Sequence, residues 1–176
     1  MTAIAATATT ANAAPEVGKL APDFTATDIM GVEQSVSKHR GKTVVIEWTN
    51  PGCPFVVKHY KTGNMQQLQK LAAANNVVWL KINSSAEGKE GHLDTEGAKA
   101  SLAKDTSEPA SYILDPEGKI GRLYEAKTTP HMYVIDKEGV LAYMGAIDSV
   151  ASFEPADVEG ATNYVQAALD ALAQGK

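Results

Sequence analysis

Two short runs of hydrophobic residues, joined by a stretch with helical spacing, organise the first half of the chain. Residues 43–49 (TVVIEWT) and 77–83 (VVWLKIN) are rich in β-branched and aromatic residues and predict buried strands. Between them, hydrophobic residues recur at helical spacing from Pro54 onward, with a weak point at Thr62-Gly63 that predicts a kink or a division of the helix. A helix between two such strands indicates a parallel pair with a right-handed crossover.

Further elements are predicted on both sides of this unit. They are a hairpin that turns at Met30-Gly31, a helix starting near Asp94, a strand at 111–114, a short helix at 121–124, a hairpin formed by 131–135 and 140–144, and an amphipathic helix over 159–173. In the last helix, Tyr164, Ala168, Leu169 and Leu172 are expected to share a face. The order predicts an α/β fold: a central mixed sheet with helices on both faces and an added N-terminal β-hairpin.

The length of 176 residues fits one domain, which we place at 17–176. Residues 1–16 are rich in Ala and Thr, and the ANA at 11–13 is typical of the segment before a signal-peptidase cut. A basic start and a continuous apolar core are missing from this stretch, so it is either a flexible tail or the remnant of an export signal. We expect a periplasmic or otherwise exported protein, with the cytoplasm as the alternative.

The charge pattern narrows the choice of partners. The net charge is -5, and Lys and Arg are scattered among acids, so we expect no nucleic acid partner. No apolar run approaches the roughly 18 residues needed to cross a bilayer, so we expect no membrane partner. The single cysteine argues against a thiolate zinc site. We expect a monomer that uses neither a metal nor a cofactor.

Cys53 is predicted to lie where the first strand gives way to the helix. There the unpaired backbone N–H groups and the helix dipole favour a thiolate. Pro54 suits the first helical position, and Lys58 and His59 can add positive potential. A small buried cysteine is the alternative interpretation. We favour a reactive thiol.

Three separated motifs carry a resemblance to a known fold. The β-α-β order with Cys53 at the junction, followed by TTPHMYVID at 128–136, resembles the thioredoxin fold. The segments VGKLAPDFTATD and EWTNPGCPFVVKHY are more similar to the redoxin branch, the alkyl hydroperoxide reductase/thiol-specific antioxidant (AhpC/TSA) superfamily, over Val17 to Met144. The resemblance implies a cis peptide bond at Thr129-Pro130 that faces Cys53. It also implies that Glu47 is a buried acid that shuttles protons, although Glu47 can equally point out of its strand.

The sequence departs from this superfamily at the second cysteine and at the peroxide-binding residues. Val56 replaces the second cysteine of thioredoxins, so a dithiol cycle within one chain is impossible. Asn50 and Ile46 replace the Thr and Pro of typical peroxiredoxins, and only Arg40 and Arg122 could supply a guanidinium. A single nucleophile remains, which can form a sulfenic acid rescued by an external thiol or a mixed disulfide with a client.

The same resemblance suggests which residues would surround a substrate: Trp48, Asn50, Pro54, Phe55 and His131. Trp48 and Phe55 can equally be core residues, and we favour the core for both. His131 can pair with Cys53, or with Cys53 and His59 bind a metal as in the copper-binding Sco proteins. Those proteins use a second cysteine, so we do not expect a metal here.

Our first hypothesis is a redoxin-like thiol-disulfide oxidoreductase or antioxidant protein, acting on small thiols, peroxide or a thiol/disulfide client protein. Cys53 is its nucleophile, Thr129 and Pro130 shape the site, and Glu47 or Lys58 assists. A non-catalytic thioredoxin-fold module that binds peptides or acts as a chaperone is the first alternative. A single-cysteine peroxidase is the second.

Overall fold

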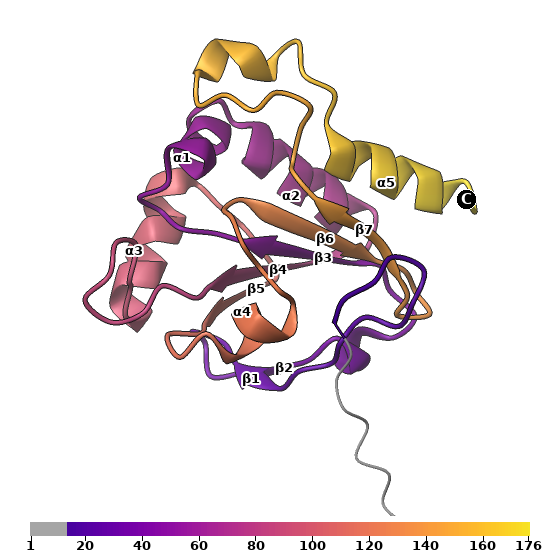
Figure 1. Cartoon of the computed structure of the whole chain (residues 1–176), viewed down its shortest axis with the longest axis horizontal. Helices are drawn as coiled ribbons and strands as arrows, with labels where there is room; N and C mark the ends of the chain where they lie inside the picture. Colours follow the sequence, from indigo (N-terminus) through magenta and orange to yellow (C-terminus); the bar gives the residue numbers. More distant parts are fainter. Residues whose placement is uncertain (1–13) are drawn as a thin grey trace, which may run out of the picture.

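The computed structural model describes residues 14–176. A five-stranded sheet with the order β5-β4-β3-β6-β7 forms its centre (Figure 1). Strand β3 pairs in parallel with β4, and β4 in parallel with β5, whereas β6 and β7 are antiparallel to their neighbours. The strands are β3 (Val44–Trp48), β4 (Val78–Asn83), β5 (Ser111–Leu114), β6 (His131–Ile135) and β7 (Leu141–Gly145). The predicted mixed sheet is confirmed.

Helices cover both faces of this sheet. The helices are α1 (Pro54–Lys61), α2 (Asn64–Ala74), α3 (Thr95–Asp105), α4 (Lys119–Leu123) and α5 (Tyr164–Ala173), with 3-10 turns η1 (Ser37–His39) and η2 (Pro155–Val158). In Figure 1, α1, α2 and α5 lie above the sheet, and α4 lies below it with the N-terminal hairpin. That hairpin consists of β1 (Ala26–Thr27) and β2 (Glu33–Gln34), and it confirms the predicted turn between them.

Alternation along β3 divides the core into two clusters. Val44, Ile46 and Trp48 point to the α4 side, where Phe24, Tyr124 and Tyr133 pack. Val45 points to the opposite side, where the cluster includes Val56, Tyr60, Met65, Leu68 and Trp79. All five residues of β3 are buried, so the strand that leads to Cys53 is held on both faces.

The predicted weak point after α1 is a true division. Gly63 has a φ of 75°, in the left-handed region that favours glycine, and α2 starts immediately after it. The start predicted for the last helix is wrong: α5 begins at Tyr164 because the Asn163 side chain accepts a hydrogen bond from the Gln166 amide and caps it there. Val165, rather than Tyr164, is its fully buried residue.

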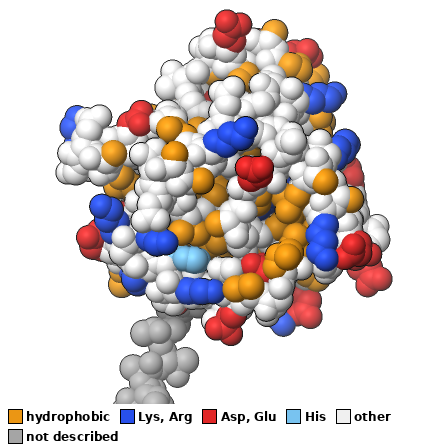
Figure 2. Space-filling view, turned by 180° about the vertical axis from the view of Figure 1, so that it is seen from behind, with side chains coloured by type: hydrophobic (Ala, Val, Ile, Leu, Met, Phe, Trp, Pro, Cys, Tyr) orange, Lys and Arg blue, Asp and Glu red, His pale blue; other side chains and the backbone are white. Residues whose placement is uncertain are grey.

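The predicted tail falls largely outside the described residues, since residues 1–13 are not part of them; Pro15 is already buried. Among residues 14–176, no helix has the length and apolar character needed to span a bilayer. Figure 2 shows positive and negative side chains interspersed over one face, with hydrophobic side chains between them.

Asp28 ties the N-terminal hairpin to the edge of the sheet. Its carboxylate accepts hydrogen bonds from the Met30 and Val32 amides at 2.9 Å, from Gln34 Nε2 at 2.9 Å and from Ser111 Oγ at 3.0 Å. Burial by itself would raise the pKa of Asp28, but these hydrogen bonds together hold it below its ordinary value. The ionised form therefore stabilises the fold.

We expect Asp28→Ala to lower the free energy of unfolding at pH 7 by about 1–3 kcal/mol, because buried donors lose their acceptor. Since the folded pKa is depressed, the stabilisation is present above the unfolded value of about 4 and is lost as the pH falls through the folded pKa. Urea unfolding at pH 7 and pH 3 measures both effects. Asp28→Asn should lose stability less steeply on acidification than the wild type.

Asp157→Asn is the matched control, since the Asp157 carboxylate accepts no hydrogen bond from a described residue. Equal acid sensitivity of the wild type and Asp28→Asn would contradict this account.

Candidate functional site

Cys53 is the N-cap residue of α1, as the sequence predicts. Its backbone carbonyl accepts the Val57 amide at 2.9 Å, and its own amide donates to the Asn50 carbonyl at 3.0 Å. Pro54 occupies the first helical turn, where its missing N–H leaves no hydrogen bond unmade. The Cys53 side chain caps no helical amide, so its sulfur is available for other contacts at the positive end of the helix dipole.

The peptide bond between Thr129 and Pro130 is cis, and it lies beside the sulfur. Cys53 Sγ donates a hydrogen bond to the Thr129 carbonyl oxygen at 3.1 Å. This contact joins residues 76 positions apart in the sequence. The thiol is half-buried and packs against the core cluster on the α1 side of the sheet. Val56, which belongs to this cluster, stands where a second cysteine would be and offers no thiol. The site therefore has one thiol, fixed between a helix end and the cis peptide.

Glu47 is fully buried on the α1 side of the sheet rather than pointing into solvent. Its carboxylate accepts hydrogen bonds from Tyr60 Oη at 2.7 Å, Trp79 Nε1 at 2.9 Å and Gln69 Nε2 at 3.4 Å. Cys53 is not among the described hydrogen-bond partners of Glu47. Three donors keep this carboxylate satisfied beneath α1.

A buried lysine lies next to the Glu47 carboxylate. Lys81 Nζ is 4.2 Å from the centre of the Tyr60 ring and 5.2 Å from that of Tyr112, so two aromatic faces surround it. Burial lowers the pKa of Lys81, while the charges of Glu47 and Asp105 oppose that shift. Burial, and next the charge of Glu47, raises the pKa of Tyr60 well above its usual range. The Tyr60 hydroxyl therefore stays protonated and donates to Glu47.

Lys58 does not reach the sulfur. It is 2% exposed, and its Nζ contacts Asp148 Oδ2 and the Val150 carbonyl, both at 3.4 Å. Asp148 belongs to the loop that follows β7, so this ion pair attaches α1 to that loop. Sequence reasoning missed Asp148, because its partner lies 90 residues away and no local pattern marks it.

His59 is buried beside the same carboxylate. Its Nε2 lies 3.5 Å from Asp148 Oδ2, and its Nδ1 lies 2.8 Å from Asn64 Nδ2. An amide NH₂ can only donate, so Nδ1 accepts and Nε2 carries the proton. Burial, and next the charge of Lys58, lowers the pKa of His59 to about 4, with Asp148 acting in the opposite direction. His59 is therefore neutral at pH 7.

The residues that the resemblance placed around a substrate divide into two groups. Trp48 is a core residue, as we favoured: it is 3% exposed, packs against the Tyr124 and Tyr133 rings, and donates from Nε1 to Ser84 Oγ at 3.0 Å. Phe55 was expected in the core, and that expectation is wrong. It is 39% exposed and meets Phe153 edge-to-face, because it lies on the solvent side of α1 next to η2.

Asn50 and His131 have partners other than the sulfur. Asn50 Oδ1 accepts the Gly52 amide at 2.8 Å, and its Nδ2 donates to the Glu90 carbonyl at 3.2 Å. The Asn50 side chain therefore shapes the loop before Cys53. His131 Nδ1 lies 3.0 Å from Tyr133 Oη, and burial, and next the charge of Lys127, lowers the pKa of His131.

The two arginines that could have served peroxide chemistry bind elsewhere. Arg40 donates to the Glu138 carbonyl, and Arg122 donates to the Glu117 carbonyl at 2.9 Å. Neither lines a described hollow beside Cys53. No cluster of three or more metal-ligating side chains occurs within residues 14–176.

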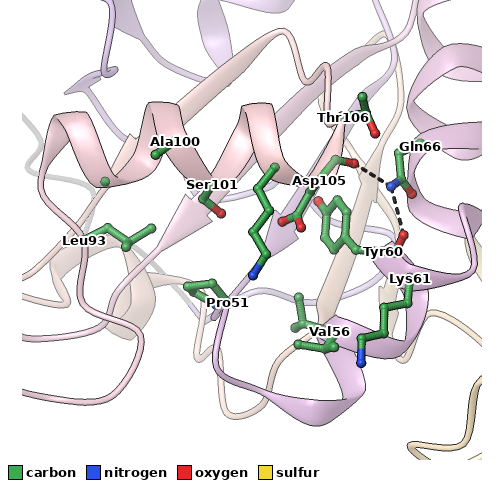
Figure 3. Close-up of a pocket in the computed structure, with 13 residues that line it drawn as sticks. Pro51, Val56, Tyr60, Lys61, Gln66, Leu93, Ala100, Ser101, Asp105 and Thr106 are labelled. Carbon is green, nitrogen blue, oxygen red and sulfur yellow. Dashed lines mark hydrogen bonds between the residues drawn. The ribbon is translucent and has the colours of Figure 1, made fainter.

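Two hollows flank α1. The larger, of about 660 Å³, lies beside the cis peptide and is bordered by α1, by residues 127–131 and by residues 145–151. The other, of about 490 Å³, lies between α1 and α3, and Figure 3 shows Tyr60, Gln66 and Asp105 along its wall. There Gln66 Nε2 donates to the Tyr60 and Asp105 carbonyls at 2.9 and 2.6 Å. Of these two hollows, the larger is the one lined by Thr129, whose carbonyl contacts Cys53, and by Pro130.

Several solved structures are similar to this chain in fold. An uncharacterized conserved protein from Geobacillus kaustophilus is 25% identical, with a TM-score of 0.78 and coverage of 92% of this chain and 84% of that one. A protein assigned as thiol:disulfide interchange protein DsbE from Chlorobium tepidum is 24% identical, with a TM-score of 0.67 and coverage of 90% and 98%. A secreted Mycobacterium tuberculosis disulfide oxidoreductase homologous to E. coli DsbE is 21% identical, with a TM-score of 0.56 and coverage of 78% and 92%.

These likenesses support the thioredoxin-like fold that the resemblance implied. No curated protein matches the chain. The AhpC/TSA family matches residues 17–144, which contain Cys53, the cis peptide and the whole sheet except Gly145, the last residue of β7. The chain belongs to the AhpC/TSA family.

Proposed function

We propose that this protein is a thiol-disulfide oxidoreductase that works with a single sulfur, Cys53. The position of that sulfur supports the proposal most directly: it lies at the start of α1 and 3.1 Å from the carbonyl of the cis Thr129-Pro130 peptide. A helix N-terminus favours a thiolate, and the half-buried sulfur leaves room for an incoming disulfide.

The reaction proceeds by three exchanges, one with the client disulfide and two with external thiols. The Cys53 thiolate attacks one sulfur of a client disulfide, that S–S bond breaks, and the departing sulfur leaves with the electron pair and takes a proton. A mixed disulfide now joins Cys53 to the client. Because Val56 offers no second thiol, an external thiolate must attack this bond, and a second one completes the cycle. In total, two external thiols are oxidised to a disulfide as the client disulfide is reduced to two thiols.

Thr129 and Pro130 position the sulfur in this scheme. Before reaction, the Thr129 carbonyl accepts a hydrogen bond from the thiol and so fixes the direction in which Sγ points. That hydrogen bond is lost when the proton leaves, because a thiolate has nothing to donate. The freed sulfur then lies beside Thr129, which lines the larger hollow, and a client can approach from there.

Glu47 is our candidate for carrying the proton. It is the fully buried acid of β3, and its Tyr60 and Trp79 hydrogen bonds hold it beneath α1, the helix that starts at Cys53. A buried carboxyl group reaches a reacting sulfur through a short relay or one water molecule. Lys58, the other assistant we considered, is paired with Asp148 and supports the reaction through the shape of the hollow.

The peptide-binding alternative shares the hollow but needs no thiolate. The exposed Phe55 and Phe153 pair at its border is the observation that favours it. A peroxidase is less well supported, since Arg40 donates to the Glu138 carbonyl and Arg122 to the Glu117 carbonyl instead of contacting Cys53. Export remains a proposal, which the description of the Mycobacterium tuberculosis neighbour as secreted supports.

We expect iodoacetamide to modify Cys53 at pH 6 about ten times faster than it modifies free cysteine, because the helix N-terminus favours the reactive thiolate. Mass spectrometry over time measures both rates. Cys53→Ser should abolish exchange with a disulfide substrate. A rate at or below that of free cysteine, together with peptide binding that is indifferent to Cys53→Ser, would establish the binding module. Hydrogen peroxide consumption with dithiothreitol above background would favour the peroxidase.

We expect Glu47→Gln to lower the rate of disulfide exchange by about tenfold or more, because glutamine cannot carry a proton. The decisive measurement is the pH profile of the rate, which should lose one ionisation in the variant. Urea unfolding identifies any loss of folding. Glu96→Gln is the matched control, since the Glu96 side chain is 81% exposed on α3. A full pH profile in Glu47→Gln, at any overall rate, would show that Glu47 is structural.

A further inference from the structure

The larger hollow is lined by the residue that contacts the Cys53 sulfur, Thr129, and has the size of a small-molecule site. Its volume of about 660 Å³ lies within the usual range of 300–1,000 Å³ for ligand pockets. Thr129 and Pro130 form one of its walls, and Thr129 is the residue whose carbonyl contacts Cys53 Sγ. A molecule in this hollow can therefore present a sulfur atom to Cys53.

The charged residues that line this hollow are Lys58, Lys127 and Asp148. The two histidines of the lining add no charge at pH 7, because the pKa of His59 is about 4 and that of His131 is also lowered. The lining therefore has two cationic side chains, Lys58 and Lys127, and one anionic side chain, Asp148. The lining residues carry one more positive than negative charge, although the chain as a whole has a charge of -5.

The Asp148 carboxylate is already engaged. Its Oδ1 accepts the Val150 amide at 3.0 Å, and its Oδ2 lies between Lys58 and His59. Lys58 is less well satisfied: an ammonium group has three N–H donors, whereas its two described contacts are both 3.4 Å long. A buried ammonium group with spare donors gains from an additional anionic acceptor.

Lys127 adds a second cation at the border of the hollow. Its Nζ lies 3.9 Å from Glu125 Oε2, but this pair is largely exposed, and exposed pairs contribute little. Lys127 also lies within the segment that leads to Thr129 and Pro130. Lys58 and Lys127 thus line the hollow from different elements, one from α1 and one from the loop before β6.

We propose that this hollow binds small organic thiols and disulfides that carry a carboxylate, with Lys58 and Lys127 holding the carboxylate while the ligand sulfur meets Cys53. The inference rests on the proposed function, because a one-thiol site needs a thiol from outside. In the reaction, the Cys53 thiolate attacks a small disulfide, the S–S bond of that molecule breaks, and one half leaves as a thiolate. The other half stays on Cys53 as a mixed disulfide.

Three symmetric disulfides of different charge test the inference: 3,3′-dithiodipropionate, 2-hydroxyethyl disulfide and cystamine, which are anionic, neutral and cationic. Each is mixed with the reduced full chain at pH 7, and the Cys53 adduct is followed by mass spectrometry. We expect the ratio of the anionic to the neutral rate to exceed the same ratio for free cysteine by about tenfold at low salt, and to fall as salt rises.

Lys127→Met and Lys58→Met should each lower this ratio by about threefold or more, because each removes one cation from the hollow. Lys61→Met is the matched control: it removes the same charge from the same helix, but Lys61 lines the other hollow, and the ratio should not change. Lys127 is exposed, so its variant keeps the test valid if Lys58→Met fails to fold.

A wild-type ratio equal to that of free cysteine would overturn the inference, as would an equal loss in Lys61→Met and Lys127→Met. In either case, normal reaction with the neutral disulfide would leave the proposed function standing. Failure of Cys53 to react with all three disulfides would overturn both.

Discussion

The pairing of β3 with β6 is the constraint on which the site depends. Its register places Trp48, the last residue of β3, opposite His131, the first residue of β6. The chain therefore leaves β3 toward Cys53 at the same edge of the sheet where it arrives from Thr129 and Pro130. A shift of one residue would turn every β3 side chain to the other face, moving Glu47 into the aromatic cluster and Trp48 under the helices. The hydrogen bond from Cys53 to Thr129 thus follows from the sheet as much as from the loops.

The face of the sheet covered by α1 and α2 contains two groups of buried polar side chains. Glu47, Lys81 and Tyr60 lie together near the centre of this layer, whereas Lys58, His59 and Asp148 lie toward its border. Both groups depend on α1, which supplies Tyr60 to one and Lys58 with His59 to the other. The helix that presents Cys53 is therefore held by two sets of buried hydrogen bonds and ion pairs. Such contacts favour one orientation over others, because a misplaced helix would leave charges buried without partners.

The fold could be predicted from the sequence because its signals are local. β-Branched runs marked β3 and β4, Gly63 marked the division between α1 and α2, and Asp94 marked the start of α3, which it caps by accepting the Gly97 amide. The exception is α5, whose start depends on an Asn163 cap that the apolar pattern of 159–173 concealed.

Much less of the site could be predicted. Cys53 and the Thr129-Pro130 peptide stood out through a resemblance, but their contact spans 76 residues. The exposure of Phe55 and the engagement of Lys58 by Asp148 depend on how the loop after β7 returns to α1. The pattern of hydrophobic and polar residues does not predict the path of this loop. Glu47 is similar: the strand pattern left its burial open, and only the packing of α1, α2 and β4 buries it and supplies Tyr60, Gln69 and Trp79 as its donors.

The absence of a sulfur at Val56 changes what the site is able to do with a captured client. In a two-cysteine site, the second thiol lies within reach and releases the mixed disulfide quickly, because an intramolecular attack has a high effective concentration. In the reaction proposed for this chain, release waits for a second molecule, so the lifetime of the mixed disulfide depends on the concentration of external thiol and on its access to Cys53. An oxidoreductase and a client-holding protein are then the fast and slow limits of one scheme. In the proposal made above, the hollow beside Thr129 and Pro130 supplies the route by which that thiol approaches Cys53, and its charges select among thiols.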